Sequence, residues 1–145
     1  MSGSGLQLTA YVDGGARGNP GPAGVGVVLV DDADGEVLHE RGRFLGRATN
    51  NVAEYQALLT ALETAAELGA DALTVRSDSE LLVRQMTGQY RVRNAGLRPL
   101  WARAGELAGG FQTFRIEHVR REKNAHADRL ANQAMNLRQD VYAAE

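Results

Sequence analysis

The sequence predicts an α/β protein, built as one five-stranded mixed sheet flanked by helices. Three observations lead to this fold class. Short apolar runs bounded by turn residues come first, a long segment with helical spacing of apolar residues follows, and strands then alternate with helices. The length of 145 residues suits a single domain over residues 1–145. We expect its structured core to span about residues 6–137.

The first three strands are expected to form an antiparallel meander. Leu8–Asp13 and Val25–Val30 are short apolar runs, and the segment between them, Gly14–Gly24, is rich in turn residues. Asp31–Gly35 has the composition of a tight turn. The return strand is therefore expected over about Glu36–Leu45.

The rest of the chain alternates between helix and strand. Apolar residues from Val52 to Ala66 recur at helical spacing, and Gly69 ends the pattern. Right-handed crossovers place the later strands beside the first strand, on the side away from the hairpin. The later strands are expected at Ala72–Arg76 and Phe114–Val119, and the later helices at Ser79–Met86, Leu97–Leu107 and Ala125–Leu137.

Composition excludes several classes of protein. The chain has no cysteine, so it has no disulfide framework and no thiolate metal site, which fits a cytoplasmic location. No apolar run approaches the roughly 20 residues of a membrane helix. No Gly-Lys-Ser/Thr follows the glycine-rich segment, so no nucleotide-binding P-loop is predicted.

The net charge of −2 means that any contact with nucleic acid must rest on local clusters. One stretch between Glu80 and Glu106 has no acidic residue. A solvated helix face and loop would explain this stretch equally well. Its arginines are Arg84, Arg91, Arg93, Arg98 and Arg103.

Four carboxylates stand where elements begin or end. Asp13 and Asp78 end the first and fourth strands, while Glu54 and Asp128 lie in the first turns of two helices. Parallel neighbouring strands are about 4.8 Å apart, so Asp13 and Asp78 would lie side by side. Each residue alone also fits an ordinary role: Asp13 precedes a turn, and Asn51-x-x-Glu54 has capping-box spacing. Asp78 and Asp128 suit the positive ends of their helices.

The chemistry of such a cluster favours hard cations. Carboxylates at one edge would repel one another and raise their pKa values unless cations held them. Oxygen-only ligation favours Mg²⁺, with Mn²⁺ as a substitute. Two such ions about 3.5–4 Å apart can activate a water and stabilise the leaving oxygen of a phosphodiester.

At these residues the chain resembles the type I ribonuclease H family, over about Leu8 to Asn136. Each motif alone is weak, but their order and their elements together are specific. They are Tyr11-Val12-Asp13-Gly14-Gly15 with Gly18-Asn19-Pro20-Gly21-Pro22-Ala23-Gly24, Thr49-Asn50-Asn51-x-x-Glu54, Ser77-Asp78-Ser79, and Asn124-x-x-x-Asp128-x-Leu130-Ala131.

The resemblance implies the ribonuclease H-like fold with strand order 3-2-1-4-5. It also implies an Mg²⁺-dependent endonuclease that cuts the RNA strand of RNA–DNA hybrids and leaves 5′-phosphate and 3′-hydroxyl ends. By this resemblance, Asp13 would bridge two metal ions and Asp128 would complete the ion that holds the attacking water. Glu54 and Asp78 would hold the other ion, and Glu54 would also contact an RNA 2′-hydroxyl.

The resemblance further implies a set of substrate-binding residues. Asn19, Asn50 and Asn51 match positions that touch the minor groove of the hybrid, and Thr49 matches a position near a DNA-strand phosphate. Gly14 belongs to the glycine segment that allows the backbone close approach to the strand. Helix capping is the alternative explanation for Asn50 and Asn51.

The chain departs from the family pattern in three places. The long basic protrusion of many members is replaced by a short segment whose Arg91 and Arg93 can do part of the same work. The loop before Asp128 is too short for the family's loop histidine. Arg120 and Arg121 are predicted to bind the substrate, and Arg121 is a candidate electrostatic substitute for that histidine. Neither His118 nor His126 is assigned a catalytic role. Glu80 replaces a glutamine near the substrate, where it would either repel a phosphate or recruit a cation.

Several alternatives remain open at this point. The chain can be a nuclease that also cuts double-stranded RNA, a catalytically silent hybrid-binding module, or an integrase-like or Holliday-junction nuclease. The intact carboxylate set argues against a silent module, and Thr49-Asn50-Asn51 with the glycine segment argues against the other nucleases. We expect a monomer that either stands alone or forms part of a longer fused chain, with the hybrid duplex as its partner and no membrane contact.

Overall fold

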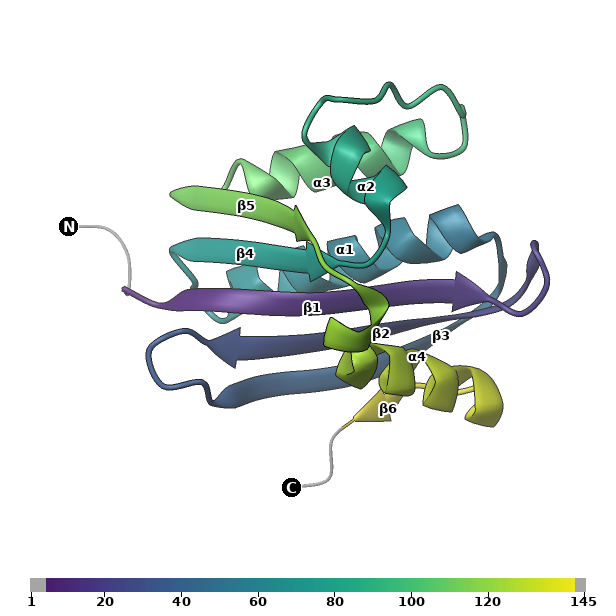
Figure 1. Ribbon diagram of the computed structural model, residues 1–145, viewed down its shortest axis with the longest axis horizontal. Coiled ribbons are helices and arrows are strands. Elements are labelled where there is room, and N and C mark those ends of the chain that lie inside the picture. Colours follow the sequence, from purple (N-terminus) through teal and green to yellow (C-terminus); the bar gives the residue numbers. More distant parts are fainter. Residues whose placement is uncertain (1–4, 143–145) are drawn as a thin grey trace.

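The computed structural model describes residues 5–142, which form one mixed sheet with helices on both faces (Figure 1). The strands β1 (Gln7–Ala16), β2 (Gly21–Asp31) and β3 (Val37–Ala48) form the expected antiparallel meander. The helix α1 (Asn50–Glu67) follows, and β4 (Ala72–Ser77) then pairs with β1 in parallel.

The second half of the chain completes the sheet and its covering layers. The strand β5 (Thr113–His118) pairs in parallel with β4, so the predicted order 3-2-1-4-5 is confirmed. The remaining elements are α2 (Glu80–Met86), α3 (Arg98–Ala108), η1 (Arg121–Lys123) and α4 (Ala125–Leu137). The single-turn helix η1 connects β5 to α4, and α4 begins and ends at the predicted residues.

A sixth strand, β6 (Val141–Tyr142), lies outside β3, so the prediction of five strands was incomplete. Side-chain contacts hold it there: Asp140 accepts a hydrogen bond from Arg41 Nη2 at 3.1 Å and another from the backbone N of Phe44 at 3.0 Å. Two residues are too few to show a strand pattern in a sequence. The predicted core end at residue 137 is therefore a few residues short.

The glycine-rich segment is mostly strand rather than turn. β1 continues to Ala16 and β2 begins at Gly21, so Arg17–Pro20 alone makes the turn, with a cis peptide bond before Pro20. The glycines have a packing function that their sequence does not reveal. A Cβ at Gly26 would overlap the backbone of Ala127, so this glycine lets α4 lie directly on the sheet.

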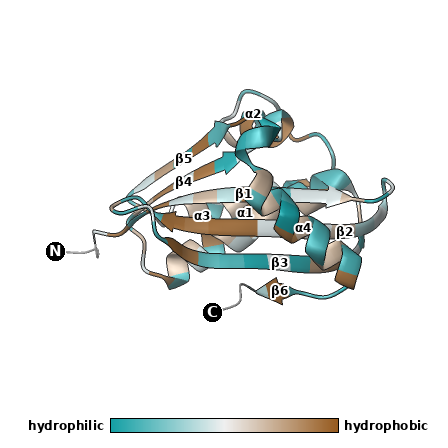
Figure 2. Ribbon diagram, turned by 60° about the horizontal axis from the view of Figure 1, so that its bottom comes forward, coloured by the Kyte–Doolittle hydropathy of each residue, from teal (hydrophilic) through white to brown (hydrophobic). Residues whose placement is uncertain are grey.

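Two layers of side chains separate the sheet from its helices. Figure 1 shows α4 in front of the sheet, with α1 and α3 behind it. Alternate β1 residues such as Leu8, Ala10 and Val12 are buried against α1 in the main core, and the intervening residues, Asp13 among them, point to the α4 side. The outer strand β3 is hydrophilic along most of its length (Figure 2). Among the described residues, no helix is long and apolar enough to span a membrane.

Candidate active site

The four predicted carboxylates line one open cleft of about 790 Å³. Asp13 lies on β1, and Asp78 directly follows β4. Because Val12 on β1 pairs with Ser77 on β4, Asp13 and Asp78 take the next positions on adjacent parallel strands. The side-by-side arrangement expected from the sequence is therefore what the structure shows.

Glu54 reaches the cleft because α1 packs closely against β1. Thr49 caps this helix, and its Oγ1 accepts a hydrogen bond from the backbone N of Val52 at 3.2 Å. Thr49 is therefore the N-cap, and Asn51 does not form the capping box that its spacing to Glu54 suggested. Gly14 lies against the helix, where a Cβ would overlap the backbone of Ala53. The missing side chain at Gly14 thus serves helix packing, which brings Glu54 close to Asp13.

Asp128 is positioned by hydrogen bonds around the first turn of α4. The Nδ2 of Asn124, a residue only 1% exposed, donates to the carbonyl of Val12 at 2.8 Å. The backbone N of Asp128 donates to the carbonyl of Asn124 at 3.1 Å. Asn124 therefore ties the start of the helix that bears Asp128 to the strand that bears Asp13.

The carboxylates strongly affect one another's protonation. Burial, followed by the charges of Asp78 and Asp128, raises the pKa of Asp13 to about 8. Burial also raises the pKa of Glu54 to about 7, against a hydrogen bond from Ser79 that lowers it. Burial raises the pKa of Asp78 as well, although the nearby Arg121 charge opposes the shift. Full ionisation of the cluster is thus unfavourable without a compensating positive charge.

The donor set fits a hard divalent cation in its chemistry. All four groups are carboxylates, and their mutual repulsion is what a bound cation relieves. Within residues 5–142, no three acidic or imidazole side chains are already placed to hold one ion together.

The predicted substrate-binding residues divide into two groups. Most of them line or border the carboxylate cleft. Those that line it are Gly14, Asn50, Asn51, Arg120 and Arg121. Asn19 and Thr49 lie beside the cleft: Asn19 Oδ1 accepts a hydrogen bond from the backbone N of Asn50 at 3.1 Å, and Thr49 caps α1. Asn50 Oδ1 in turn accepts from the backbone N of Ala16 at 2.7 Å, so these amides join the β1–β2 turn to α1.

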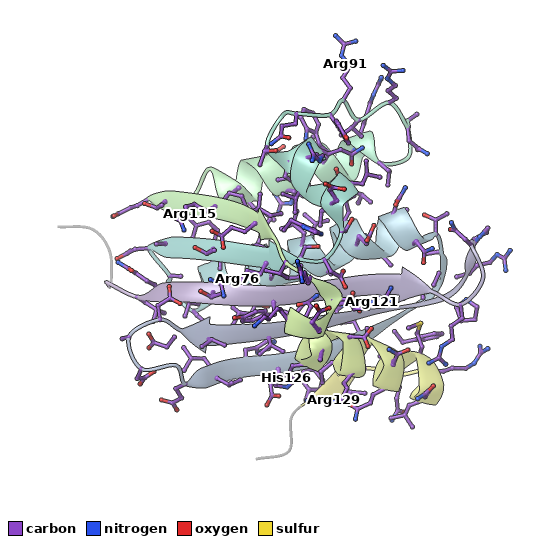
Figure 3. All side chains as sticks on the ribbon, viewed as in Figure 1. Arg76, Arg91, Arg115, Arg121, His126 and Arg129 are labelled. Carbon is purple, nitrogen blue, oxygen red and sulfur yellow. The ribbon has the colours of Figure 1, made fainter. Side chains whose placement is uncertain are left out.

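The second group lies away from the cleft. Arg91 and Arg93 are exposed on the loop between α2 and α3 and are not among the residues that line it. Figure 3 shows Arg91 extending outward from this loop, far from Arg121. Any contact between these two arginines and a substrate requires a duplex longer than the cleft.

Glu80 has a partner that its position in the family pattern did not suggest. Its carboxylate accepts hydrogen bonds from Nη2 of Arg84 at 2.9 Å and from Nε at 3.2 Å. The Arg84 guanidinium also lies over the Tyr90 ring, 5.3 Å from its centroid. The charge of Glu80 is therefore matched by an arginine one helical turn away.

Four further polar residues line the cleft and were not predicted as site residues: Arg17, His118, Glu122 and Asn132. Arg17 lies in the β1–β2 turn, and its Nη2 donates to Asn132 Oδ1 of α4 at 3.1 Å. A single arginine among glycines carries no periodic signal, and its partner is 115 residues away. The strand position of His118 at the end of β5 was predicted, but its place at the cleft was not.

Comparisons with known proteins point to one family. A family described as "Reverse transcriptase-like" matches residues 11–134. A ribonuclease HI of Halobacterium salinarum is 49% identical over 132 residues, which is 91% of this chain and 66% of that protein. The bifunctional protein Rv2228c of Mycobacterium tuberculosis is 44% identical over 97% of this chain and 38% of its own length. The chain thus spans less than two thirds of these relatives.

Solved structures agree with the sequence matches. The crystal structure of RNase H1 from Halobacterium salinarum superposes with a TM-score of 0.87 at 49% identity, covering 90% of this chain and 98% of that one. LC11-RNase H1, solved in complex with an RNA/DNA hybrid, gives a TM-score of 0.85 at 44% identity, covering 91% and 99%. The fold, the motifs and these matches together establish that this chain belongs to the type I ribonuclease H family.

Proposed function

We propose that the protein hydrolyses the RNA strand of RNA–DNA hybrids with the help of two Mg²⁺ ions, for which Mn²⁺ can substitute. The observation that carries the proposal is the convergence of Asp13, Glu54, Asp78 and Asp128 in one cleft. The pKa values of three of these groups, Asp13, Glu54 and Asp78, are raised there. The hybrid bound to the related LC11-RNase H1 supports the choice of substrate.

The four carboxylates would hold the ions, with Asp13 shared between them. When bound, the ions would lower the pKa of a water and stabilise the charge on the leaving oxygen. The expected products are a 5′-phosphate and a 3′-hydroxyl. The chain itself supplies the rigid placement of its ligands, because β1, β4, α1 and α4 each fix one carboxylate.

Recognition of the hybrid is assigned to the polar rim of the cleft. The amides of Asn19, Asn50 and Asn51 can bond sugar hydroxyls and base edges without requiring one sequence. Gly14 and Thr49 lie at the same edge, and a 2′-hydroxyl distinguishes RNA from DNA there. Arg120 and Arg121 provide positive charge in the same cleft.

The test is cleavage of labelled duplexes with each combination of RNA and DNA strands, with and without Mg²⁺. We expect Mg²⁺-dependent cleavage of the RNA strand in the hybrid and ends of the stated chemistry. Cleavage of double-stranded RNA at a similar rate would favour the relaxed nuclease. Hybrid binding without cleavage would favour the silent binding module.

The Asp13→Asn variant is the matched control because it keeps the size of the side chain and removes one ligand charge. We expect it to lose cleavage while retaining hybrid binding. Turnover equal to the parent protein would refute the metal assignment. We also propose a cytoplasmic monomer, and sedimentation of the purified chain tests the oligomeric state.

A further inference from the structure

Asn124, which precedes α4, and two side chains of that helix lie along β1 and the turn that follows it. Asn124 donates to the carbonyl of Val12, and Asp128 lines the same cleft as Asp13. One further turn along the helix, Asn132 accepts from Arg17. The spacing of four residues places Asn124, Asp128 and Asn132 on one helix face. Arg17 therefore stands at the end of the row that holds two of the proposed ligands.

The contacts of Arg17 fix its direction without using all its donors. Nη2 donates to Asn132 Oδ1 at 3.1 Å and more weakly to the Asn132 carbonyl at 3.4 Å. Asn132 is itself held, because its Nδ2 donates to the carbonyl of Asp128 at 3.0 Å. A guanidinium has five N–H groups, so Nε and Nη1 remain as donors for a ligand.

Charge in the cleft is distributed unevenly. The four carboxylates line it, and Arg120 and Arg121 line it from the segment between β5 and α4. Arg17 adds a cation from the turn between β1 and β2. A phosphodiester chain that crosses the carboxylates would thus meet arginines from two separate segments.

We propose that Arg17 is a substrate-binding residue that contacts a backbone phosphate of the strand lying in the cleft. The inference rests on the proposed function, since it requires a nucleic acid in the same cleft. Arg17 is exposed, so its guanidinium is accessible. Planar N–H groups held by Asn132 suit the paired oxygens of a phosphate.

The experiment measures hybrid affinity in the Asp13→Asn background, where the substrate is not consumed, by fluorescence anisotropy at several salt concentrations. Arg17→Ala should weaken binding by about tenfold, the loss expected for one charge-assisted hydrogen bond. The slope of log affinity against log salt should become shallower by about 0.9, as for one phosphate contact. Arg17→Lys should keep the slope because it keeps the charge.

Arg129→Ala is the matched control. Arg129 lies on the same helix as Asn132 but lines a different hollow, together with Glu40 and His126. Its removal changes the net charge equally and should leave affinity within about twofold. Affinity of Arg17→Ala equal to that of Arg129→Ala would overturn the proposal, and so would a lysine variant that loses as much slope as the alanine variant.

The outcome is separable from that of the proposed function. Cleavage by the parent protein is assayed independently of binding. If the parent binds the hybrid through Arg17 but does not cut it, the proposed function fails and the inference stands. If the parent cuts the hybrid and Arg17→Ala binds normally, the inference fails alone.

Discussion

Asp13 is surrounded by three other carboxyl groups, and its protonation depends on them. Its pKa of about 8 has burial as the largest cause, with the charges of Asp78, Asp128 and Glu54 adding to it. In the unfolded chain this group would titrate near 3.8. The folded protein without metal therefore binds more protons than the unfolded chain between these two values.

The stability of the metal-free protein therefore depends on pH through Asp13. For this group the free energy of unfolding falls as the pH rises from about 4 to about 8. Asp13→Asn should weaken this dependence and stabilise the metal-free protein near pH 8 by on the order of 2 kcal/mol. Urea unfolding in EDTA at acidic and alkaline pH measures the free energy of unfolding of both proteins. If it changed equally with pH in the parent and in Asp13→Asn, Asp13 would not be the source of the pH dependence.

Arg121 is the cation that opposes the raised pKa of Asp78. In the proposed enzyme it would stabilise negative charge where many members use a loop histidine. We expect Arg121→Ala to lower kcat by roughly tenfold or more, within the range for loss of an electrostatic contact. Unchanged kcat in Arg121→Ala would remove the residue from the mechanism.

At the scale of elements, the close packing of α4 on the sheet depends on a glycine. Gly26→Ala would place a methyl group against the backbone of Ala127. We expect a loss of stability of about 3 kcal/mol or more, and weaker Mg²⁺ binding because α4 carries Asp128. Calorimetric melting and titration with Mg²⁺ measure the two effects.

Gly105→Ala is the matched control for this glycine. It lies inside α3, and an added Cβ there would meet no atom within 4 Å. A helical alanine should stabilise the protein by about 0.5–1 kcal/mol with no change in Mg²⁺ affinity. If Gly26→Ala had the same melting temperature and Mg²⁺ affinity as Gly105→Ala, the close packing of α4 on Gly26 would contribute neither to stability nor to metal binding.

The elements also show which parts of the fold can be predicted from the sequence alone. The meander, the crossovers and both ends of α4 were predictable because apolar periodicity marks them. The true lengths of β1 and β2 were not, since their glycines face α4 and α1 and replace the usual alternation of side chains. β6 owes its place to Asp140 and Arg41, a tertiary contact that no local pattern encodes.

The candidate site was predictable for a related reason. Asp13 and Asp78 end parallel strands, so topology alone brings them together. Arg17 and Asn132 meet only after α4 docks on the sheet, so neither could be placed beforehand. Arg91 and Arg93 were predicted to bind the substrate from the local run of positive charge and the resemblance to the family, and the structure places them on a loop outside the cleft.

At the scale of the whole molecule, a net charge of −2 must coexist with binding to a polyanion. The loop that bears Arg91 and Arg93 projects from the body (Figure 3), so it would meet only a duplex that extends past the cleft. Replacing both by alanine should make the salt slope of binding shallower by about 2 for a long hybrid and leave a short hybrid unaffected. Equal effects for both lengths would contradict this placement.

The short pairing between β6 and β3 bears on how the molecule behaves at high concentration. β6 pairs only with Arg41 and Gly42 of the long β3 strand, and the Asp140 side chain accepts from the backbone N of Phe44. Within the described residues no strand pairs with the rest of this edge, so another sheet could add to it. Arg43 and Arg47 add positive charge to β3, whereas Arg41 is paired with Asp140 at 3.1 Å and Glu40 carries the opposite sign. Charged side chains on an edge strand oppose the pairing of two copies. We therefore expect salt to lower the solubility of this protein before it affects the fold, because salt screens these charges.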